Sequence, residues 1–177
     1  MSSPSLPFST SYWVIPNRFL AGEYPGSFNG EESTRKKMDV FLEAGLDTFI
    51  DLTYPGERAP YKHILLEQAR YYQKDVRVHH FPIEDFGVVT PETMRALLNT
   101  IDAALAEGRN IYLHCWAGVG RTGTTVGCYL VRHGMTGDEA LAQLARWWAT
   151  DPRRFTFKRT LETDEQVQFV RGWHELA

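Results

Sequence analysis

The stretch Asn110-Ile-Tyr-Leu-His-Cys-Trp-Ala-Gly-Val-Gly-Arg-Thr-Gly123 decides the fold, because it joins a short apolar strand to a helix through a glycine-rich turn. The apolar residues at its start predict a buried strand. The segment from about Thr122 to His133 predicts a helix, which Gly134 ends. A strand that enters a helix in this way is typical of layered α/β domains.

Strands and helices alternate along the rest of the chain. Short apolar or alternating runs predict strands at residues 13–15, 19–21, 48–53 and 76–81. Helical spacing and capping residues predict helices at about residues 31–44, 60–70, 91–107 and 136–151, and from Thr163 onward. The alternation predicts an α/β fold, in which a mainly parallel central sheet is flanked by helices.

The length and composition predict one domain. The chain has 177 residues, of which 43% are apolar, and this is enough for a single compact core. Residues 1–11 are rich in Ser and Pro, so we expect a flexible tail there. The single folded domain is expected to cover residues 12–177.

Charge and cysteine content exclude several classes of protein. With 19 Lys and Arg against 22 Asp and Glu, the net charge of −3 argues against a nucleic-acid partner. No apolar run approaches the ~20 residues of a membrane span, and the N-terminal segment lacks a signal-peptide pattern. Two cysteines, Cys115 and Cys128, make no disulfide framework, so we expect a cytoplasmic protein. The sequence predicts no metal site, and it does not indicate which oligomeric state the protein adopts.

The turn after the strand has the features of an anion site. Gly118 and Gly120 allow the backbone to curl, so that successive N–H groups converge at a helix N-terminus. Such a cradle suits the three outer oxygens of a phosphoryl group. We therefore predict that the loop binds the substrate phosphate through the residues Trp116, Ala117, Gly118, Val119, Gly120, Arg121 and Thr122.

Four side chains in this stretch have chemical tasks. The converging amides favour the thiolate of Cys115, which is a good nucleophile toward phosphorus. Arg121 offers a planar fork for two phosphate oxygens. Thr122 can donate its hydroxyl to the Cys115 sulfur, and we expect His114 to orient the loop through a hydrogen bond to the backbone.

Other glycine-rich motifs fit less well. The nucleotide-binding pattern GxxxxGK[ST] is absent. The letters GxGxxG are matched by residues 118–123, but the acidic residue expected about 20 positions later, after a second strand, is missing because that segment is predicted to be helical. The alternative is that Cys115 is a small buried core residue beside a turn and has no catalytic role.

The arrangement His-Cys-x-x-Gly-x-x-Arg-Thr resembles the signature loop of the cysteine-dependent protein tyrosine and dual-specificity phosphatases. His114, Cys115, Gly118, Arg121 and Thr122 match every fixed position. The resemblance extends more loosely from about residue 13 to residue 173, and the short chain is similar to the compact dual-specificity group. It implies a dual-specificity phosphatase-like fold, a phosphocysteine intermediate and no cofactor, since Arg121 and the amides supply the positive charge.

The resemblance also implies a general acid on an earlier loop. The family's Pro-x-x-Asp arrangement is matched by Pro82 and Asp85, and Asp85 lies 30 residues before the cysteine (115 − 85 = 30). Glu84 is the alternative acid. Some family members position the hydrolytic water with a late glutamine, which points to Gln166, although Thr163-x-x-Gln166 is also a helix capping box.

The expected activity is hydrolysis of phosphotyrosine, and also of phosphoserine or phosphothreonine, in proteins. A small phosphomonoester is the other substrate expected. The alternatives are an inositol-phosphate or phosphoinositide phosphatase, a rhodanese-like sulfurtransferase and a silent phosphate-binding module. Family members that act on inositol phosphates often carry Lys in the loop, whereas Trp116, Ala117 and Val119 are neutral here.

Overall fold

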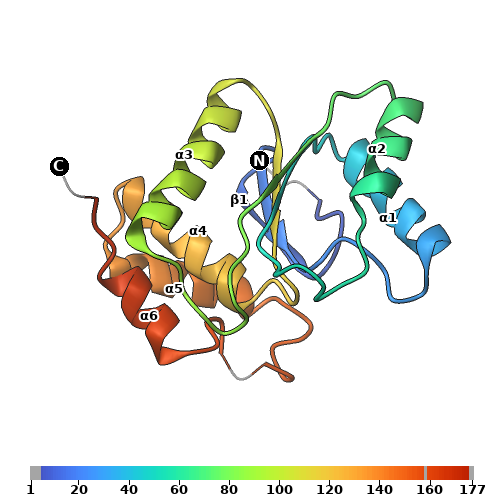
Figure 1. Cartoon of the computed structure of the whole chain (residues 1–177). Coiled ribbons are helices and arrows are strands. Elements are labelled where there is room, and N and C mark those ends of the chain that lie inside the picture. Colours follow the sequence, from blue (N-terminus) through green and yellow to red (C-terminus); the bar gives the residue numbers. More distant parts are fainter. Residues whose placement is uncertain (1–4, 158, 176–177) are drawn as a thin grey trace.

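A computed structural model describes residues 5–157 and 159–175, and within them the chain forms one five-stranded sheet with helices on both faces (Figure 1). The strand order is β1-β2-β5-β3-β4, and only β1 runs antiparallel to its neighbour. The strands are β1 Ser11–Ile15, β2 Phe19–Gly22, β3 Thr48–Asp51, β4 Arg77–His80 and β5 Ile111–His114. The predicted mainly parallel α/β fold is confirmed.

The helices form two groups. Helices α1 and α2 cover one face of the sheet, and α3 to α6 lie together on the other (Figure 1). Their bounds are α1 Glu31–Glu43, α2 Lys62–Tyr71, α3 Pro91–Ala106, α4 Gly120–Arg132, α5 Gly137–Trp148 and α6 Asp164–Arg171. Helix α4 begins two residues before the predicted start, because the glycine-rich turn is itself taken into the first helical turn.

The central strand β5 is buried on both faces. Ile111 and Leu113 pack with the core beneath α3 and α4, whereas Tyr112 packs with the core beneath α1 and α2. The same alternation occurs in β2, where Leu20 faces the α1 side. Successive side chains of a strand point to opposite faces, so one strand anchors both layers.

Threonine caps fix three helix starts as predicted. The Oγ1 atoms of Thr90, Thr136 and Thr163 accept hydrogen bonds from the backbone N–H three residues later. The last two are complete capping boxes, closed by Glu139 and Gln166. Each box satisfies donors that a helix start leaves without partners.

The N-terminal segment makes contacts with the domain from its first described residues. The Phe8 ring lies 4.7 Å from that of Phe41, and Trp13 Nε1 donates to the Ser5 carbonyl at 3.3 Å. Ser11 is already part of β1. Residues 1–4 of the expected tail lie outside the described residues, and the division into a tail and one domain stays a prediction.

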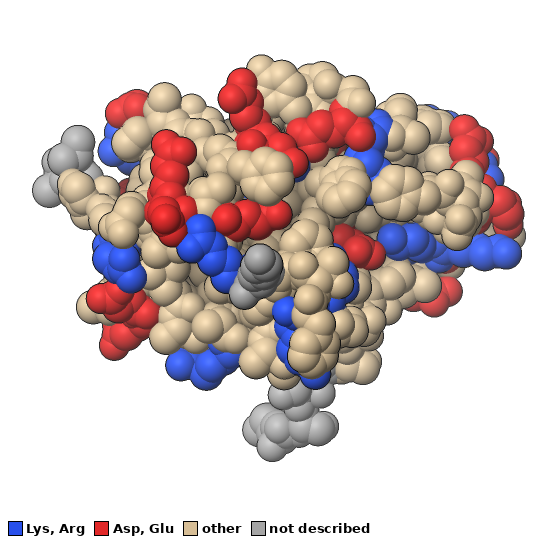
Figure 2. Space-filling model, turned by 90° about the horizontal axis from the view of Figure 1, so that it is seen from below, with Lys and Arg blue, Asp and Glu red and all other residues tan. Residues whose placement is uncertain are grey.

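The carboxyl ends of β2, β5, β3 and β4 meet at one edge of the sheet, where the next segments begin. Figure 2 views the molecule from below Figure 1, the side on which the loop between β4 and α3 and the start of α4 lie. Acidic and basic side chains are intermixed on this side (Figure 2). Open α/β sheets place their sites at this edge. None of the described helices is both long enough and apolar enough to cross a membrane.

Candidate active site

The loop between β5 and α4 turns its carbonyls outward. The Trp116 carbonyl accepts from Tyr24 N at 3.1 Å, and the Ala117 carbonyl accepts from an Arg153 guanidinium nitrogen at 2.7 Å. Because the N–H and C=O of a peptide unit point in opposite directions, the neighbouring amides face into the loop. The Gly118 amide donates to Cys115 Sγ at 3.2 Å. Inward-facing amides of this kind are typical of an anion-binding loop, which we call the cradle, and its binding of phosphate stays a prediction.

Gly118 makes this curl possible. Its φ is +74°, in the left-handed region, and a Cβ on it would overlap the backbone of Gly22 at the end of β2. A residue with a side chain would strain the backbone and push the loop away from the sheet. The cradle is therefore set by close contact between two backbone segments.

Arg121 lies at the centre of the site and is 1% exposed. Its two terminal nitrogens donate to both carboxylate oxygens of Glu57, at 2.7 and 3.0 Å. One of them also donates to the Ile83 carbonyl at 2.9 Å, and the other lies 3.1 Å from Asp85 Oδ1. The guanidinium thus joins the loops that follow β3, β4 and β5.

The charges of Arg121 and Glu57 stabilise each other. Burial disfavours the charged form of Arg121, but Glu57, Cys115 and Asp85 outweigh it and raise the pKa of the guanidinium. Burial likewise opposes ionisation of Glu57, yet the hydrogen bonds from Arg121 and from Tyr54 N lower the pKa of its carboxyl. Both groups are therefore ionised at neutral pH.

Two donors at the site have no partner among the described residues. They are Arg121 Nε and Thr122 Oγ1, and both atoms are buried. The expected hydrogen bond from Thr122 to the Cys115 sulfur is not formed in this structure, where the Gly118 amide reaches the sulfur instead. Buried donors without a partner are costly. Their position beside the cradle fits donors that serve an anionic ligand.

His114 supports the loop from behind. It is fully buried, its Nδ1 lies 3.3 Å from the Cys115 carbonyl, and its Nε2 lies 2.8 Å from the Tyr61 hydroxyl. A carbonyl only accepts, so Nδ1 carries the proton and Tyr61 donates to Nε2. Burial lowers the pKa of His114 from 6.5 to about 4. The ring is therefore neutral and holds the Cys115 carbonyl away from the cradle.

Asp85 is the carboxylate that the β4–α3 loop brings to Arg121. Glu84 is exposed, its backbone carbonyl accepts from Gly87 N at 2.9 Å, and its side chain has no hydrogen bond to any residue that the structure describes. Two hydrogen bonds tie the loop to the start of α6: Thr163 Oγ1 donates to the Phe86 carbonyl at 3.3 Å, and Gln166 Nε2 donates to that of Gly87 at 3.2 Å. This anchoring places Asp85, rather than Glu84, at the mouth of the cradle.

Gln166 lies beside the cradle, but much of its amide is already used. Its Oε1 accepts from Glu162 N at 2.9 Å and from Thr163 N at 3.3 Å. The side chains of Gln166 and Glu162 lie against Gly120, so that a Cβ atom at position 120 would clash with both of them. Burial and then Asp85 raise the pKa of Glu162. The water-positioning role of Gln166 stays a prediction.

Sequence reasoning missed Glu57, Tyr61 and Glu162. Glu57 and Tyr61 follow β3, whose carboxyl end lies beside that of β5, so the rule that places sites at this edge was the signal available for them.

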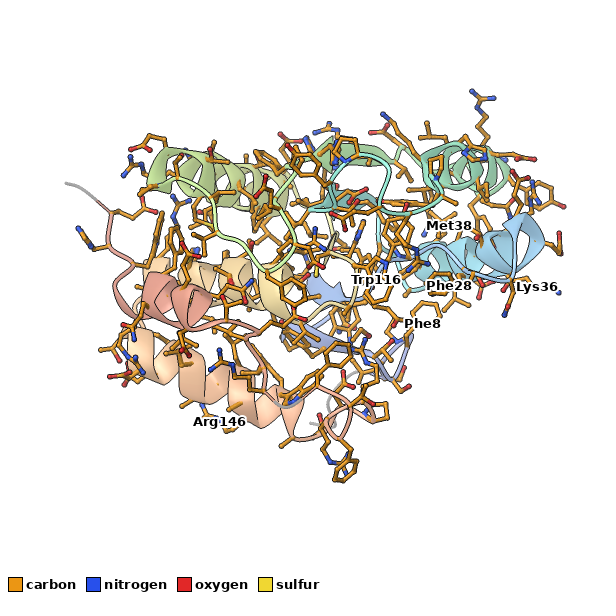
Figure 3. All side chains as sticks on the ribbon, turned by 60° about the horizontal axis from the view of Figure 1, so that its bottom comes forward. Phe8, Phe28, Lys36, Met38, Trp116 and Arg146 are labelled. Carbon is orange, nitrogen blue, oxygen red and sulfur yellow. The ribbon has the colours of Figure 1, made fainter. Side chains whose placement is uncertain are left out.

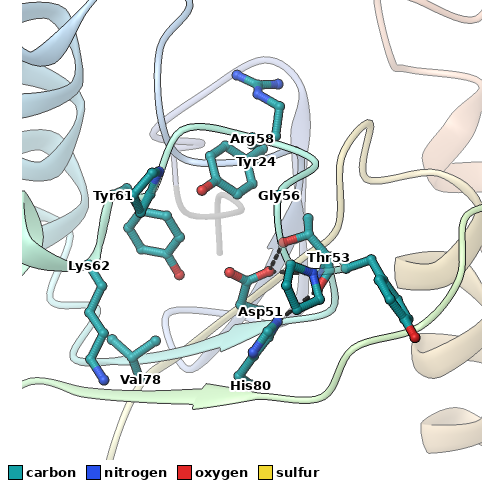
Figure 4. Close-up of a pocket in the computed structure, with 12 residues that line it drawn as sticks. Tyr24, Asp51, Thr53, Gly56, Arg58, Tyr61, Lys62, Val78 and His80 are labelled. Atoms are coloured by element: carbon teal, nitrogen blue, oxygen red, sulfur yellow. Dashed lines mark hydrogen bonds between the residues drawn. The ribbon is translucent and has the colours of Figure 1, made fainter.

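A cavity of about 250 Å³ lies under the segment that follows β3 and is lined by Asp51, Tyr61 and His80 (Figure 4). The Thr53 hydroxyl and amide both donate to Asp51 there, at 2.6 and 2.8 Å.

Comparison with known proteins agrees with this geometry. The family model described as "Polymorphic toxin system, DSP-PTPase phosphatase" matches residues 25–135. The mouse protein tyrosine phosphatase domain-containing protein 1 is 32% identical over 139 residues, which are 74% of this chain and 18% of that protein. The chain therefore spans less than a fifth of this relative.

Two further relatives broaden the comparison. The Arabidopsis thaliana protein named phosphatidylinositol 3,4,5-trisphosphate 3-phosphatase and protein-tyrosine-phosphatase PTEN1 is 30% identical over 132 residues, 72% of this chain and 30% of its own. The crystal structure of Tk-PTP in the active form superposes with a TM-score of 0.69 at 21% identity, covering 92% of this chain and 94% of that one. The second likeness concerns the fold alone.

The close approach of Gly118 to β2 predicts a sharp difference between two glycines. Gly118→Ala and Gly134→Ala both place alanine at a positive φ, which costs about 1–2 kcal/mol, but only Gly118 meets backbone atoms. We expect Gly118→Ala to abolish binding of inorganic phosphate in calorimetry. Gly134→Ala should bind phosphate as the parent does. Equal affinity in both variants would show that the cradle does not depend on this contact.

The neutral state of His114 predicts a pH dependence of stability. Its pKa falls from 6.5 in the unfolded chain to about 4 in the folded one, so the unfolded chain binds more protons within this window. The free energy of unfolding should therefore fall as the pH is lowered from 6.5 to 4, by about 3 kcal/mol from this group. Urea denaturation at several pH values measures it, and the slope should be smaller in His114→Gln. An equal slope in both proteins would assign the effect to other groups.

Proposed function

The chain belongs to the dual-specificity and protein tyrosine phosphatase family and is a cysteine-based phosphatase of that type, and we propose that it hydrolyses phosphotyrosine in proteins, with phosphoserine and phosphothreonine as further substrates. The observation that carries the proposal is the cradle itself. Cys115 Sγ lies among inward-facing amides, and the buried Nε of Arg121 has no partner within the described part of the chain. This arrangement supports a phosphocysteine intermediate.

The first step forms the sulfur–phosphorus bond. Cys115 Sγ attacks phosphorus in line with the ester oxygen, and the phosphorus–oxygen bond breaks with its electron pair going to that oxygen. Asp85 gives a proton to the leaving oxygen, so that no free phenoxide has to depart. Arg121 and the loop amides bind the three outer oxygens and stabilise the charge that they carry in the transition state.

The second step returns the enzyme to its starting state. Water attacks the phosphocysteine while Asp85 takes one of its protons, and the sulfur–phosphorus bond breaks to release the Cys115 thiolate and inorganic phosphate. Thr122 Oγ1, buried and without a partner among the described residues, can donate to the departing sulfur. We assign the placing of the water to Gln166, whose Nε2 lies at the rim of the cradle.

The second candidate is an inositol-phosphate or phosphoinositide phosphatase. The name of the Arabidopsis relative, which includes a phosphatidylinositol 3,4,5-trisphosphate 3-phosphatase, favours it. The neutral Trp116, Ala117 and Val119 of the loop weigh against it, because they add no charge for the further phosphates of such substrates. We propose a cytoplasmic location from the reduced cysteines.

Replacement of the nucleophile tests the proposal. Cys115→Ser should lose hydrolysis of p-nitrophenyl phosphate, because a serine hydroxyl at this place is a far weaker nucleophile than a thiolate. The same variant should still bind a phosphotyrosine peptide. Cys128→Ala is the matched control, since Cys128 is buried in the core between α4 and its neighbours and should leave the activity in place. Hydrolysis that survives in Cys115→Ser would refute the mechanism.

The acid role of Asp85 predicts a dependence on the leaving group. Asp85→Asn should slow kcat on phenyl phosphate by about 10²-fold or more, and much less on p-nitrophenyl phosphate, whose phenoxide leaves without help. Glu84→Gln, one residue away and exposed, should slow neither. Kinetics with a series of substituted phenyl phosphates measures the difference. An equal loss on all of them would remove Asp85 from the acid role.

A further inference from the structure

A hollow of about 270 Å³ lies directly beside the phosphate cradle. Its lining comes from the segment after β2, from α1, from the loop after β3 and from the cradle, and includes Glu23, Phe28, Lys37, Arg58 and Trp116. Phe28 and Trp116 lie next to each other (Figure 3), with ring centroids 6.2 Å apart. They are 77% and 43% exposed, which is high for large aromatic side chains.

The guanidinium of Arg58 lies over these aromatic rings. Its guanidinium carbon lies 3.6 Å from the centroid of Phe28, 4.7 Å from that of Tyr24 and 5.7 Å from that of Trp116. Its hydrogen bond to the Gly26 carbonyl is long, at 3.5 Å. Stacking on aromatic faces orients a guanidinium and leaves its edge, which carries the donors, able to meet an anion.

Arg58 has no carboxylate within ion-pair distance among the described residues. The nearby carboxylate, Glu23, lies 3.2 Å from Arg153 and 3.8 Å from Lys37, so its charge is shared with two other cations. Burial lowers the pKa of Arg58, and Tyr24 and Glu23 offset this only in part. The hollow therefore carries positive charge that the described part of the protein does not balance.

The position of Arg58 links the hollow to the scissile phosphate. Arg58 follows Glu57, which holds Arg121, and Trp116 follows Cys115. Because Trp116 and Arg58 line the same hollow and Arg58 lies 5.7 Å from the Trp116 ring, we expect the residue next to a phosphotyrosine bound in the cradle to reach Arg58. The exposed rings of Phe28 and Trp116 offer apolar contact to the chain that joins the two groups.

We propose that Arg58, stacked on Phe28 beside Trp116, binds an acidic side chain next to the phosphotyrosine, so that the enzyme prefers phosphopeptides in which that neighbour is Asp or Glu. The inference rests on the proposed function and names its substrate class. An aromatic residue beside a guanidinium suits a peptide, which supplies both an apolar chain and a carboxylate. Inositol polyphosphates would offer anionic groups without apolar contact.

Paired phosphopeptides test the proposal. Each pair differs only in Glu against Gln at one position beside the phosphotyrosine, and kcat/KM is measured for both. The parent enzyme should prefer the Glu peptide by about tenfold at low salt, as expected for one charge-assisted hydrogen bond, and by less at 0.5 M NaCl. Arg58→Gln should bring the ratio close to one. Lys36→Gln, on the outward side of α1 and away from Trp116 (Figure 3), should keep the ratio of the parent.

The charge-reversal variant Arg58→Glu tests the same proposal even if Arg58→Gln is unstable. Arg58→Glu should prefer a peptide with Lys beside the phosphotyrosine over its Glu counterpart, and only a folded enzyme can show such a reversal. A ratio near one in the parent enzyme, or an equal ratio in the parent and Arg58→Gln, would overturn the proposal. So would a dependence on Arg58 that occurs with inositol polyphosphates and not with peptides.

The failure of this inference is distinguishable from failure of the proposed function. If the parent enzyme hydrolyses both peptides of a pair at the same rate, the function stands and the acidic subsite is wrong. If neither peptide is hydrolysed while inositol phosphates are, both are overturned.

Discussion

The site depends on one buried positive charge. Arg121 is almost fully excluded from solvent, and a guanidinium in that position is tolerated only when carboxylates and carbonyls surround it. Glu57, the Ile83 carbonyl and Asp85 provide these partners from loops that follow β3 and β4. The charge of Arg121 therefore orders two loops that are distant in sequence from the cradle. The arrangement of the loops around Cys115 follows from the need to compensate the charge of Arg121.

The cradle is held from outside in the same way. Its carbonyls accept from Tyr24 N and from Arg153, and the Cys115 carbonyl faces His114. Each of these contacts takes up an acceptor that would otherwise repel a phosphate, and each leaves an amide pointing inward. Strand β2 contributes twice, through Tyr24 just after it and through the close approach of Gly22 to Gly118. The inner strand β2 and the turn after it thus help to hold the cradle in place.

Sequence reasoning predicted the parts of this arrangement that are local. The loop from Cys115 to Arg121, the threonine caps and the alternation of strands and helices are written in short stretches, and the structure contains them. The predicted start of α4 was late because Gly120 and Arg121 already adopt helical backbone. Glu57 and Glu162 escaped prediction, since their importance comes from the strand order and from the return of α6 to the loop after β4. No local pattern contains that information.

The two carboxylates that contact Arg121 differ in how tightly the structure holds them. Glu57 contacts the guanidinium with both oxygens, accepts a further bond from Tyr54 N and is 21% exposed. Asp85 contacts it with one oxygen, which also accepts from Phe86 N at 3.1 Å, and is 51% exposed. The bidentate partner is the more costly to remove, so it fixes the orientation of Arg121. The monodentate partner lies at the mouth, on a loop whose anchors are backbone carbonyls of Phe86 and Gly87 rather than Asp85 itself. Its carboxyl can turn away from Arg121 while the loop stays in place, and this is the freedom that the proposed role of Asp85, as acid in the first step and base in the second, requires.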